Sequence, residues 1–427
     1  MLIIFIGVFI VLMLIGVPVA FAMGGTAFIS AIILWGIDGM PIDILIQRVA
    51  YGCNNFTNLA IPLFLLAGQL MNGGSITKRI FSFAQSCVGH LPGGLGHVNV
   101  LASIIFAGMS GTATADTAGL GTIEIKAMSD AGFDKEFSVA VTGASGLIGP
   151  IIPPSVPMVM YGVISGVSVG ALFIGGIIPG LLMGVAMCIL VYVYAVKRNY
   201  PRCDKISFKQ FSRGLYEAIP VLLAPVIIIG GIWTGIFTAT EAAGVVVIYA
   251  LFLDMIVYKD LTIASFWKII KSVAIDSATI LIIIACVSVY GYVLTRTRIP
   301  MILAEAIFAV TTNPFIILIL LNLFLLVVGC FMSTMESIIL LTPILVPLCE
   351  QAGINTMVFG VIMCLNLMIG QLTPPFGMVL FLLTKISKLP MSTVVKACLP
   401  FTVPVLVVLI LCLLFPQIIT FLPSITI

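Results

Sequence analysis

The fold of this chain is decided by the stretch Ile148-Gly149-Pro150-Ile151-Ile152-Pro153-Pro154. Its two ends recur 221 residues later, where Ile369-Gly370 precedes Pro374-Pro375 at the same spacing. The same offset aligns further pairs, namely Gly108 with Gly329 and Ala131-Gly132 with Ala352-Gly353. Single matches of Gly or Pro are common, but one offset that serves several features indicates an internal duplication.

These stretches lie in a chain that is too apolar for a soluble domain. Of its 427 residues, 61% are hydrophobic and 8% are charged, and the mean hydropathy is +1.29. A helix needs about 20 apolar residues to cross a hydrocarbon core, and such stretches repeat from end to end. The sequence therefore predicts an all-α polytopic protein of the bacterial inner membrane.

Membrane segments are predicted near 1–17, 18–37, 56–72, 136–165 and 172–196, and again near 217–236, 238–257, 276–295, 356–384 and 398–420. Two further apolar regions, about 98–130 and about 313–350, are too long for one span and are interrupted by Gly, Ser, Thr and Pro. We expect both to be re-entrant helical hairpins. Amphipathic stretches at 42–46 and 263–267 form another pair at the common offset, outside the spans.

The distribution of basic residues predicts the topology. Lys197 to Arg213 carries six Lys or Arg and one acid, which places it in the cytoplasm by the positive-inside rule. Threading outward from it puts 16 of the 19 basic residues on the cytoplasmic side and leaves only Arg48, Arg296 and Arg298 outside. The first repeat is thus 1–196, the cytoplasmic connector is 197–216, and the second repeat is 217–427.

Each half has an odd number of predicted crossings, so the two copies must lie in opposite orientations. Such inverted repeats are typical of secondary transporters, which bind substrate and ions near the midplane at broken helices. The chain has no GxxxxGK[ST] phosphate loop, and His90 and His97 lack companions at metal-ligand spacing. We therefore expect a transporter rather than an enzyme, with no cofactor and no nucleic-acid partner.

The two proline pairs predict breaks in the spans 136–165 and 356–384. Proline removes a backbone donor and clashes with the preceding turn. Unwound backbone survives in a bilayer only where protein or a cavity satisfies it. The freed carbonyls are suitable ligands for a hard cation. A structural kink is the alternative interpretation, and it weakens when two breaks occupy matched positions.

The hairpin tips have related sequences. The first reads Gly108-Met109-Ser110-Gly111-Thr112-Ala113-Thr114-Ala115-Asp116, and the second reads Gly329-Cys330-Phe331-Met332-Ser333-Thr334-Met335-Glu336-Ser337. Small, hydroxyl-rich tips beside helix breaks suit Na⁺, although small residues also favour close helix packing without any ion. An acid inside the membrane is a functional candidate, and the alternative for Asp116 and Glu336 is a wet hairpin edge.

The motifs of the first half and the end of the chain resemble the large membrane subunit of TRAP (tripartite ATP-independent periplasmic) transporters. The matching stretches are Gly96-His97-Val98-Asn99, Glu124-Ile125-Lys126-Ala127-Met128, Ile148-Gly149-Pro150, Pro153-Pro154-Ser155, Thr373-Pro374-Pro375 and Phe415-Pro416-Gln417-Ile418-Ile419. The resemblance covers essentially the whole chain and is strongest to the sialic-acid branch. It implies an elevator-type transporter, similar in fold to divalent-anion:sodium symporters, in which the hairpins and broken helices move together.

The resemblance also implies partners, a coupling ion and candidate residues. The partners are a soluble periplasmic binding protein and a small four-helix membrane subunit, which we expect to be a separate chain because this one begins at the large subunit's first span. Na⁺ is the coupling ion. One Na⁺ site would use Gly108, Ser110, Thr112, Ile152 and Ser155, and a second Gly329, Met332, Ser333, Thr334, Thr373 and Phe376. Substrate would contact Ser110, Thr112, Thr114, Asp116, Ser155, Ser333, Thr334 and Thr373, between the tips.

The expected function is Na⁺-coupled import of an organic acid, with sialic acid as the leading substrate and a C4-dicarboxylate as the alternative. Two other classes remain open at this point. One is an ion channel, which single-channel currents would identify. The other is a membrane enzyme acting on lipid-linked sugars, which would need clustered acids or histidines at a wet interface, and none is evident in the sequence.

Overall fold

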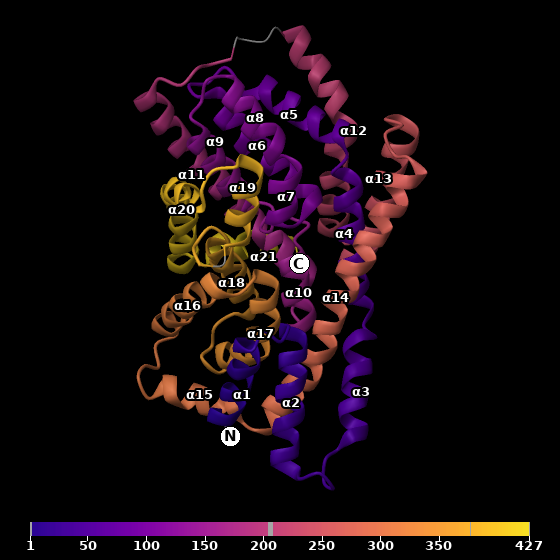
Figure 1. Cartoon of the computed structure of the whole chain (residues 1–427), viewed down its shortest axis with the longest axis vertical. Coiled ribbons are helices and arrows are strands. Elements are labelled where there is room, and N and C mark those ends of the chain that lie inside the picture. Colours follow the sequence, from indigo (N-terminus) through magenta and orange to yellow (C-terminus); the bar gives the residue numbers. More distant parts are fainter. Residues whose placement is uncertain (1, 204–207, 376, 427) are drawn as a thin grey trace.

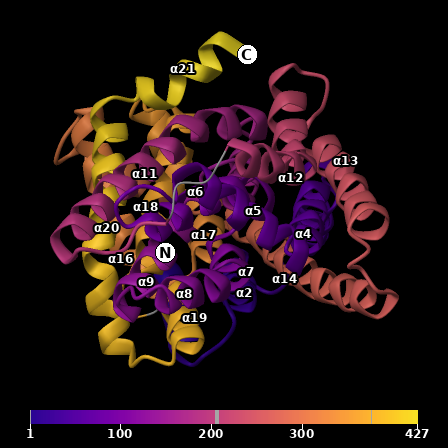
Figure 2. The same ribbon diagram turned by 90° about the horizontal axis from the view of Figure 1, so that it is seen from above.

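The computed structural model describes residues 2–203, 208–375 and 377–426 of the chain. Within these ranges every regular element is helical, which confirms the all-α prediction. Six of the described helices are long and apolar enough to cross a membrane, or seven when one bent pair is included. The helices are described below as two groups. Seen from above, the helices of residues 208–257, from one group, and the helix of residues 391–414, from the other, lie on opposite sides of the molecule (Figure 2).

The first group, called the frame group, comes from the start of each half. Its helices are α1 (Leu2–Leu14), α2 (Val19–Trp35), α3 (Ile42–Cys53), η1 (Phe56–Leu59), α4 (Ala60–Met71), α5 (Gly74–Val88), α12 (Phe208–Trp233), α13 (Ala239–Phe252), η2 (Leu253–Val257), α14 (Ile263–Arg296) and α15 (Ile299–Phe308). The long α14 packs against α2, α3 and α4, while α13 packs against α4 and α12.

The second group, called the hairpin group, contains the predicted hairpins and broken helices. Its helices are α6 (Gly94–Ser110), α7 (Ala113–Gly119), α8 (Gly121–Asp130), α9 (Lys135–Gly146), α10 (Val156–Ser165), α11 (Val169–Arg198), α16 (Pro314–Phe331), α17 (Thr334–Gln351), α18 (Thr356–Gln371), α19 (Met378–Ser387), α20 (Met391–Leu414) and α21 (Gln417–Thr426). In Figure 1, α5 and α8 lie at the upper end and α1 and α15 at the lower end.

Local sequence explains where the hairpins turn. Gly111 follows α6 with a φ of 66°, a left-handed conformation that glycine adopts at little cost. The second arm of each hairpin then begins with a hydroxyl cap: Thr112 accepts from the Ala115 amide at 3.3 Å, and Ser333 caps α17. These two caps are 221 residues apart. The helices of the first region run from Gly94 to Asp130, and those of the second from Pro314 to Gln351.

The breaks also fall where proline predicts them. Helix α9 ends at Gly146 and α10 begins at Val156, while α18 ends at Gln371 and α19 begins at Met378. The Pro153–Pro154 and Pro374–Pro375 peptide bonds are both cis. Residues 147–155 of the first broken segment and residues 372–375 and 377 of the second are not helical.

Three boundaries differ from the sequence prediction. The polar connector is shorter than 197–216, because α11 extends to Arg198 and α12 already begins at Phe208. The stretch 263–267 continues into the following span as one helix, Ile263–Arg296, which no Gly or Pro interrupts before Gly291. The second arm of the first hairpin is divided at Leu120 into α7 and α8. Asn72 approaches the chain there, since a Cβ on Gly119 would lie 2.1 Å from the Asn72 Oδ1 atom.

Buried polar bonds fasten each hairpin to its broken helix. Asn99 on α6 donates to the Thr142 hydroxyl at 2.7 Å and accepts from the Ser145 hydroxyl at 2.6 Å, both on α9. In the second half, Asn366 on α18 donates to the side-chain oxygen of Asn322 on α16 at 2.8 Å. Buried polar groups that are bonded in this way fix the relative position of the helices that carry them.

Candidate functional site

The first hairpin tip rests directly on the first break. The amide of Val156 donates to the carbonyl of Gly111 at 3.2 Å. The approach is so close that a Cβ on Gly111 would lie 2.7 Å from the Pro154 carbonyl oxygen. The structure thus brings together two segments that the sequence separates by about forty residues, as the predicted site requires.

Asp116 is the acid at this junction. Its carboxylate accepts a short hydrogen bond from the Ser110 hydroxyl, and its side chain is 1% exposed. A Cβ on Gly149 would lie 2.6 Å from the second carboxylate oxygen, which has no hydrogen-bond partner among the described residues. Asp116 therefore lies buried against the break rather than at a wet hairpin edge, and one of its oxygens is available to a ligand.

The other predicted members of the first Na⁺ site have diverse surroundings. Ser155 is buried and caps α10, where it accepts from the Met158 amide at 3.2 Å and donates to the Pro150 carbonyl. Ile152 packs against Gly180 of α11. Gly108 faces the frame group, because a Cβ there would lie 2.6 Å from the Pro225 side chain. Ile152 and Gly108 have only backbone oxygens to offer an ion.

The second tip meets the second break through polar and steric contacts. Gln371 Nε2 donates to the Thr334 hydroxyl at 2.8 Å, and that hydroxyl in turn lies 3.4 Å from the Leu367 carbonyl oxygen. Helices α16 and α18 cross at Gly329 and Gly370, where a Cβ on Gly370 would lie 2.2 Å from the Gly329 oxygen. The second junction is therefore as close as the first, with an amide side chain in place of a buried acid.

Glu336 does not play the part of Asp116. It belongs to a capping box, in which the Ser333 amide donates to the Glu336 carboxylate at 3.3 Å and the Ser333 hydroxyl accepts from the Glu336 amide at 3.4 Å. The Thr373 hydroxyl donates to the Ile369 carbonyl at 2.8 Å. Met332 is extended at the end of α16, and Phe376 lies outside the described residues.

Burial divides the predicted polar residues into two sets. Ser110, Asp116, Ser155 and Thr334 are buried. The remaining hydroxyls are partly exposed, namely those of Thr112, Thr114, Ser333 and Thr373. Buried oxygens suit a dehydrated ion, whereas partly exposed hydroxyls can reach a larger solute.

Sequence reasoning missed Gln371 and Glu124. Gln371 occupies the break itself, so its position between Gly370 and the proline pair was the signal that could have found it. Glu124 is 1% exposed, and neither of its carboxylate oxygens has a hydrogen-bond partner among the described residues. Its burial could not be predicted from local sequence, because α8 also carries Lys, Thr, Ser and Asp.

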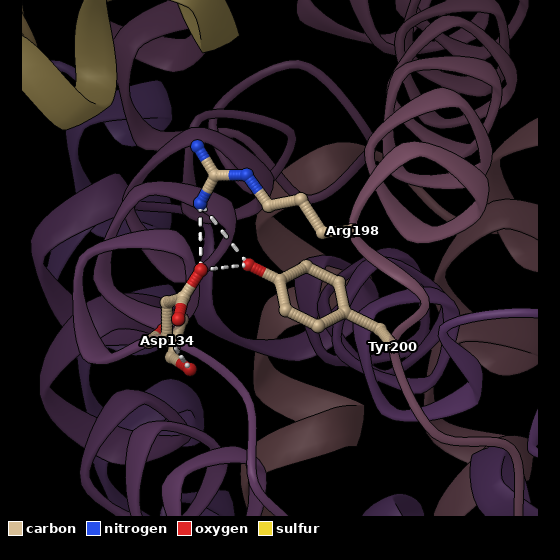
Figure 3. A network of polar contacts seen from close by, with 4 residues as sticks. Asp134, Arg198 and Tyr200 are labelled. Carbon is tan, nitrogen blue, oxygen red and sulfur yellow. Dashed lines mark hydrogen bonds and ion pairs between the residues drawn. The ribbon is translucent and has the colours of Figure 1, made fainter.

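Three side chains, those of Asp134, Arg198 and Tyr200, contact one another where the loop before α9 meets the end of α11 (Figure 3). Arg198 Nη1 lies 2.7 Å from Asp134 Oδ2, and the Tyr200 hydroxyl donates to the same oxygen at 2.5 Å. These bonds, the Tyr200 hydroxyl foremost, lower the pKa of Asp134. Burial and the neighbouring carboxylate raise the pKa of Tyr200 to about 12. The contacts tie the loop before α9 to the end of α11.

Two helical hairpins that each contact a broken helix are typical of membrane proteins that carry solutes. Residues 6–418 match the family described as "Tripartite ATP-independent periplasmic transporter, DctM component". The chain belongs to this family, and it is therefore a multi-pass inner-membrane component of a tripartite transporter, as the sequence motifs predicted.

Relatives and a solved structure agree with this assignment. The chain is 44% identical to the sialic acid TRAP transporter large permease protein SiaM of Vibrio cholerae, with 96% of this chain and 95% of the relative covered. It is 35% identical to the C4-dicarboxylate TRAP transporter large permease protein DctM of Pseudomonas aeruginosa, with 87% of each covered. The crystal structure of the YdaH transporter of Alcanivorax borkumensis has a similar fold, with a TM-score of 0.64, 14% identity and 88% of each chain covered.

Proposed function

We propose that this chain is the subunit through which N-acetylneuraminate, a sialic acid, crosses the inner membrane together with Na⁺. The observation that carries the choice of substrate is the 44% identity to a sialic acid permease over 96% of the chain. The C4-dicarboxylate permease is less similar, at 35% identity over 370 residues. A small four-helix membrane subunit, as a separate chain, and a periplasmic binding protein complete the proposed transporter.

The two junctions support the Na⁺ coupling. At the first, the free oxygen of Asp116 and the carbonyls of the break lie beside the tip hydroxyls. At the second, Thr334 and Gln371 supply neutral oxygens beside the backbone of Gly329. Na⁺ prefers such hard oxygen ligands, and unwound helices supply them at membrane depth. We assign the Na⁺ sites to these two junctions, with the partly exposed hydroxyls directed to the substrate.

The matched element bounds support an inverted repeat and an elevator movement. In the proposed cycle, the hairpin group carries the substrate and slides against the frame group, which stays fixed in the bilayer. The two groups meet along α5 and α6 and along α14 and α17. Locking these contacts with a cross-link should stop transport without preventing Na⁺ binding.

Reconstitution tests the proposal. Proteoliposomes that contain this chain and its membrane partner, supplied with loaded binding protein, should accumulate labelled N-acetylneuraminate only under an inward Na⁺ gradient. Equal uptake with K⁺ in place of Na⁺ would reject the coupling. Uptake of succinate, with none of N-acetylneuraminate, would instead favour the C4-dicarboxylate alternative.

A further inference from the structure

A cavity of about 600 Å³ lies between the two groups, on the side opposite the basic connector. Its frame wall comes from α3 and α14, and its hairpin wall comes from α10 and α17. The volume lies within the range of small-molecule sites. It is lined by polar as well as apolar residues, including Tyr51, Asn55, Ser288 and Thr295.

Two arginines face one aromatic ring in this cavity. The guanidinium carbon of Arg48 lies 5.3 Å from the centre of the Tyr292 ring, and that of Arg296 lies 5.4 Å from it. Trp35 stacks on the same ring, with the centroids 6.3 Å apart. The ring attracts each cation, but it leaves their mutual repulsion in place.

Within the described part of the chain, neither arginine forms an ion pair with a carboxylate. The ion pairs of the described residues involve Arg79, Arg198 and Arg213, and none involves Arg48 or Arg296. The residues that line the cavity include no Asp or Glu. Both arginine side chains are exposed and so are accessible to a solute, and a guanidinium binds a carboxylate through two parallel hydrogen bonds.

The topology makes these arginines exceptional. Of the 19 basic residues, only Arg48, Arg296 and Arg298 fall on the periplasmic side, against the general bias of membrane proteins. Two of those three line a single cavity. The positive-inside rule favours basic residues on the opposite side of the membrane, so it does not explain why Arg48 and Arg296 line this cavity. Binding of an anionic ligand would explain it.

We infer that this cavity is a periplasmic binding site for the carboxylate of the incoming sugar acid, held by Arg48 and Arg296 before it reaches the hairpin tips. The hydroxyls of Tyr51 and Thr295 and the amide of Asn55 match a hydroxylated solute. This inference rests on the proposed function, because it takes the transported acid as the ligand. It also supplies the cationic groups that the hairpin tips lack.

Trp35 provides a direct readout. In a Trp233→Phe, Trp267→Phe background, Trp35 is the sole tryptophan and reports on the ring that both arginines cover. N-acetylneuraminate, added at constant ionic strength to the reconstituted chain and a membrane partner whose own tryptophans are replaced by phenylalanine, should change the Trp35 fluorescence saturably. The neutral sugar N-acetylmannosamine should not, because it has no carboxylate.

Arginine variants then assign the effect to the cavity. The double variant Arg48→Gln, Arg296→Gln should weaken the binding of N-acetylneuraminate at least about tenfold, the cost of losing a charge-assisted bond. Arg298→Gln is the matched control, because it removes the same charge two residues away, outside the cavity, and should leave binding within about twofold. Lysine at both positions should give an intermediate affinity, since it keeps the charge and loses the planar fork.

The outcomes separate this inference from the proposed function. If the wild type accumulates N-acetylneuraminate with Na⁺ but Trp35 does not respond, or responds equally in the glutamine variant, the cavity site is rejected and the proposed function stands. If the transporter carries only succinate, the same titration with succinate decides the site independently. If the glutamine variant loses affinity only for the binding protein, with no effect of the free acid on Trp35, the arginines form a protein contact and the inference fails.

Discussion

The side-chain amide nitrogen of Gln371 lies 2.8 Å from the hydroxyl oxygen of Thr334, so the second break donates a hydrogen bond to the second hairpin tip. This bond fixes the orientation of the Thr334 hydroxyl and leaves the Gln371 carbonyl oxygen buried without a hydrogen-bond partner in the described part of the chain. A buried carbonyl oxygen of this kind is a ready ligand for a cation. The side-chain oxygen of Gln371 is therefore a candidate Na⁺ ligand at the second junction in addition to those predicted from the sequence.

Replacing Thr334 with Val tests whether the second junction binds Na⁺. The variant keeps the shape of the side chain and removes the hydroxyl, so the half-saturating Na⁺ concentration for uptake should rise about fivefold, the equivalent of about 1 kcal/mol. Thr384→Val is the control, because that hydroxyl donates to the Leu380 carbonyl on α19, outside the tips and breaks. Equal Na⁺ dependence in both variants would exclude Thr334 from the site.

Replacing Asp116 with Asn tests the charge at the first junction. Asparagine can still accept a hydrogen bond from Ser110, so the fold should persist, while Na⁺-dependent uptake should fall at least about tenfold because a charged ligand is lost. Asp43→Asn, at the exposed start of α3, should transport normally. Normal uptake by the Asp116 variant would show that its charge is dispensable.

The crossing of α16 and α18 should tolerate alanine at one glycine and not at the other. A Cβ on Gly370 would lie 2.2 Å from the Gly329 oxygen, whereas a Cβ on Gly329 would make ordinary contacts at 3.4 Å and beyond. Gly370→Ala should therefore lower the free energy of unfolding by about 1–3 kcal/mol and impair uptake. Gly329→Ala should melt in detergent close to the wild type. The reverse order would contradict the described crossing.

The Asp134 contacts predict a pH-dependent contribution to stability. Because the pKa of Asp134 lies below its ordinary value of 3.8 in the folded chain, the stabilisation is complete above the unfolded-state pKa and is lost as the pH falls through the folded one. Asp134→Asn should thus lower the melting temperature at pH 7, with a difference that disappears in acid. Asp130→Asn, at the exposed end of α8, is the control and should show no such trend. A difference that persists at low pH would exclude the charge as its cause.

Local rules were sufficient for much of the fold. A left-handed glycine, a hydroxyl cap or a proline pair determines the backbone conformation of its immediate neighbours only. The helix ends at the tips and breaks could therefore be predicted from the local sequence. The continuity of α14 could not, because Asp276-Ser277 could equally have capped the start of a new helix at this position. The division of the arm at Leu120 likewise lies beside Asn72, which approaches Gly119 from the end of the distant helix α4.

The sequence predicted which segments form the candidate site better than it predicted what each of their side chains contacts. The tips and breaks do meet, yet the sequence interpretation treated Asp116 and Glu336 alike, as the acids that end the two tips, although the common offset pairs Asp116 with Ser337. One is buried against Gly149, and the other caps its own helix. The difference arises from the register of each acid relative to its cap, since Asp116 lies four residues after Thr112 and Glu336 three after Ser333. Only the position three residues after a cap can close a capping box.

The arginine cavity has one wall on each group of helices. Gly52 and Ser288 line it from the frame group, whereas Val163 and Pro343 line it from the hairpin group. Any sliding of one group along the other must carry the second pair past the first and change the enclosed space. A pair of spin labels placed on Ser288 and Pro343 would act as a ruler for that displacement, reading the position of the carrier in its cycle from a single distance.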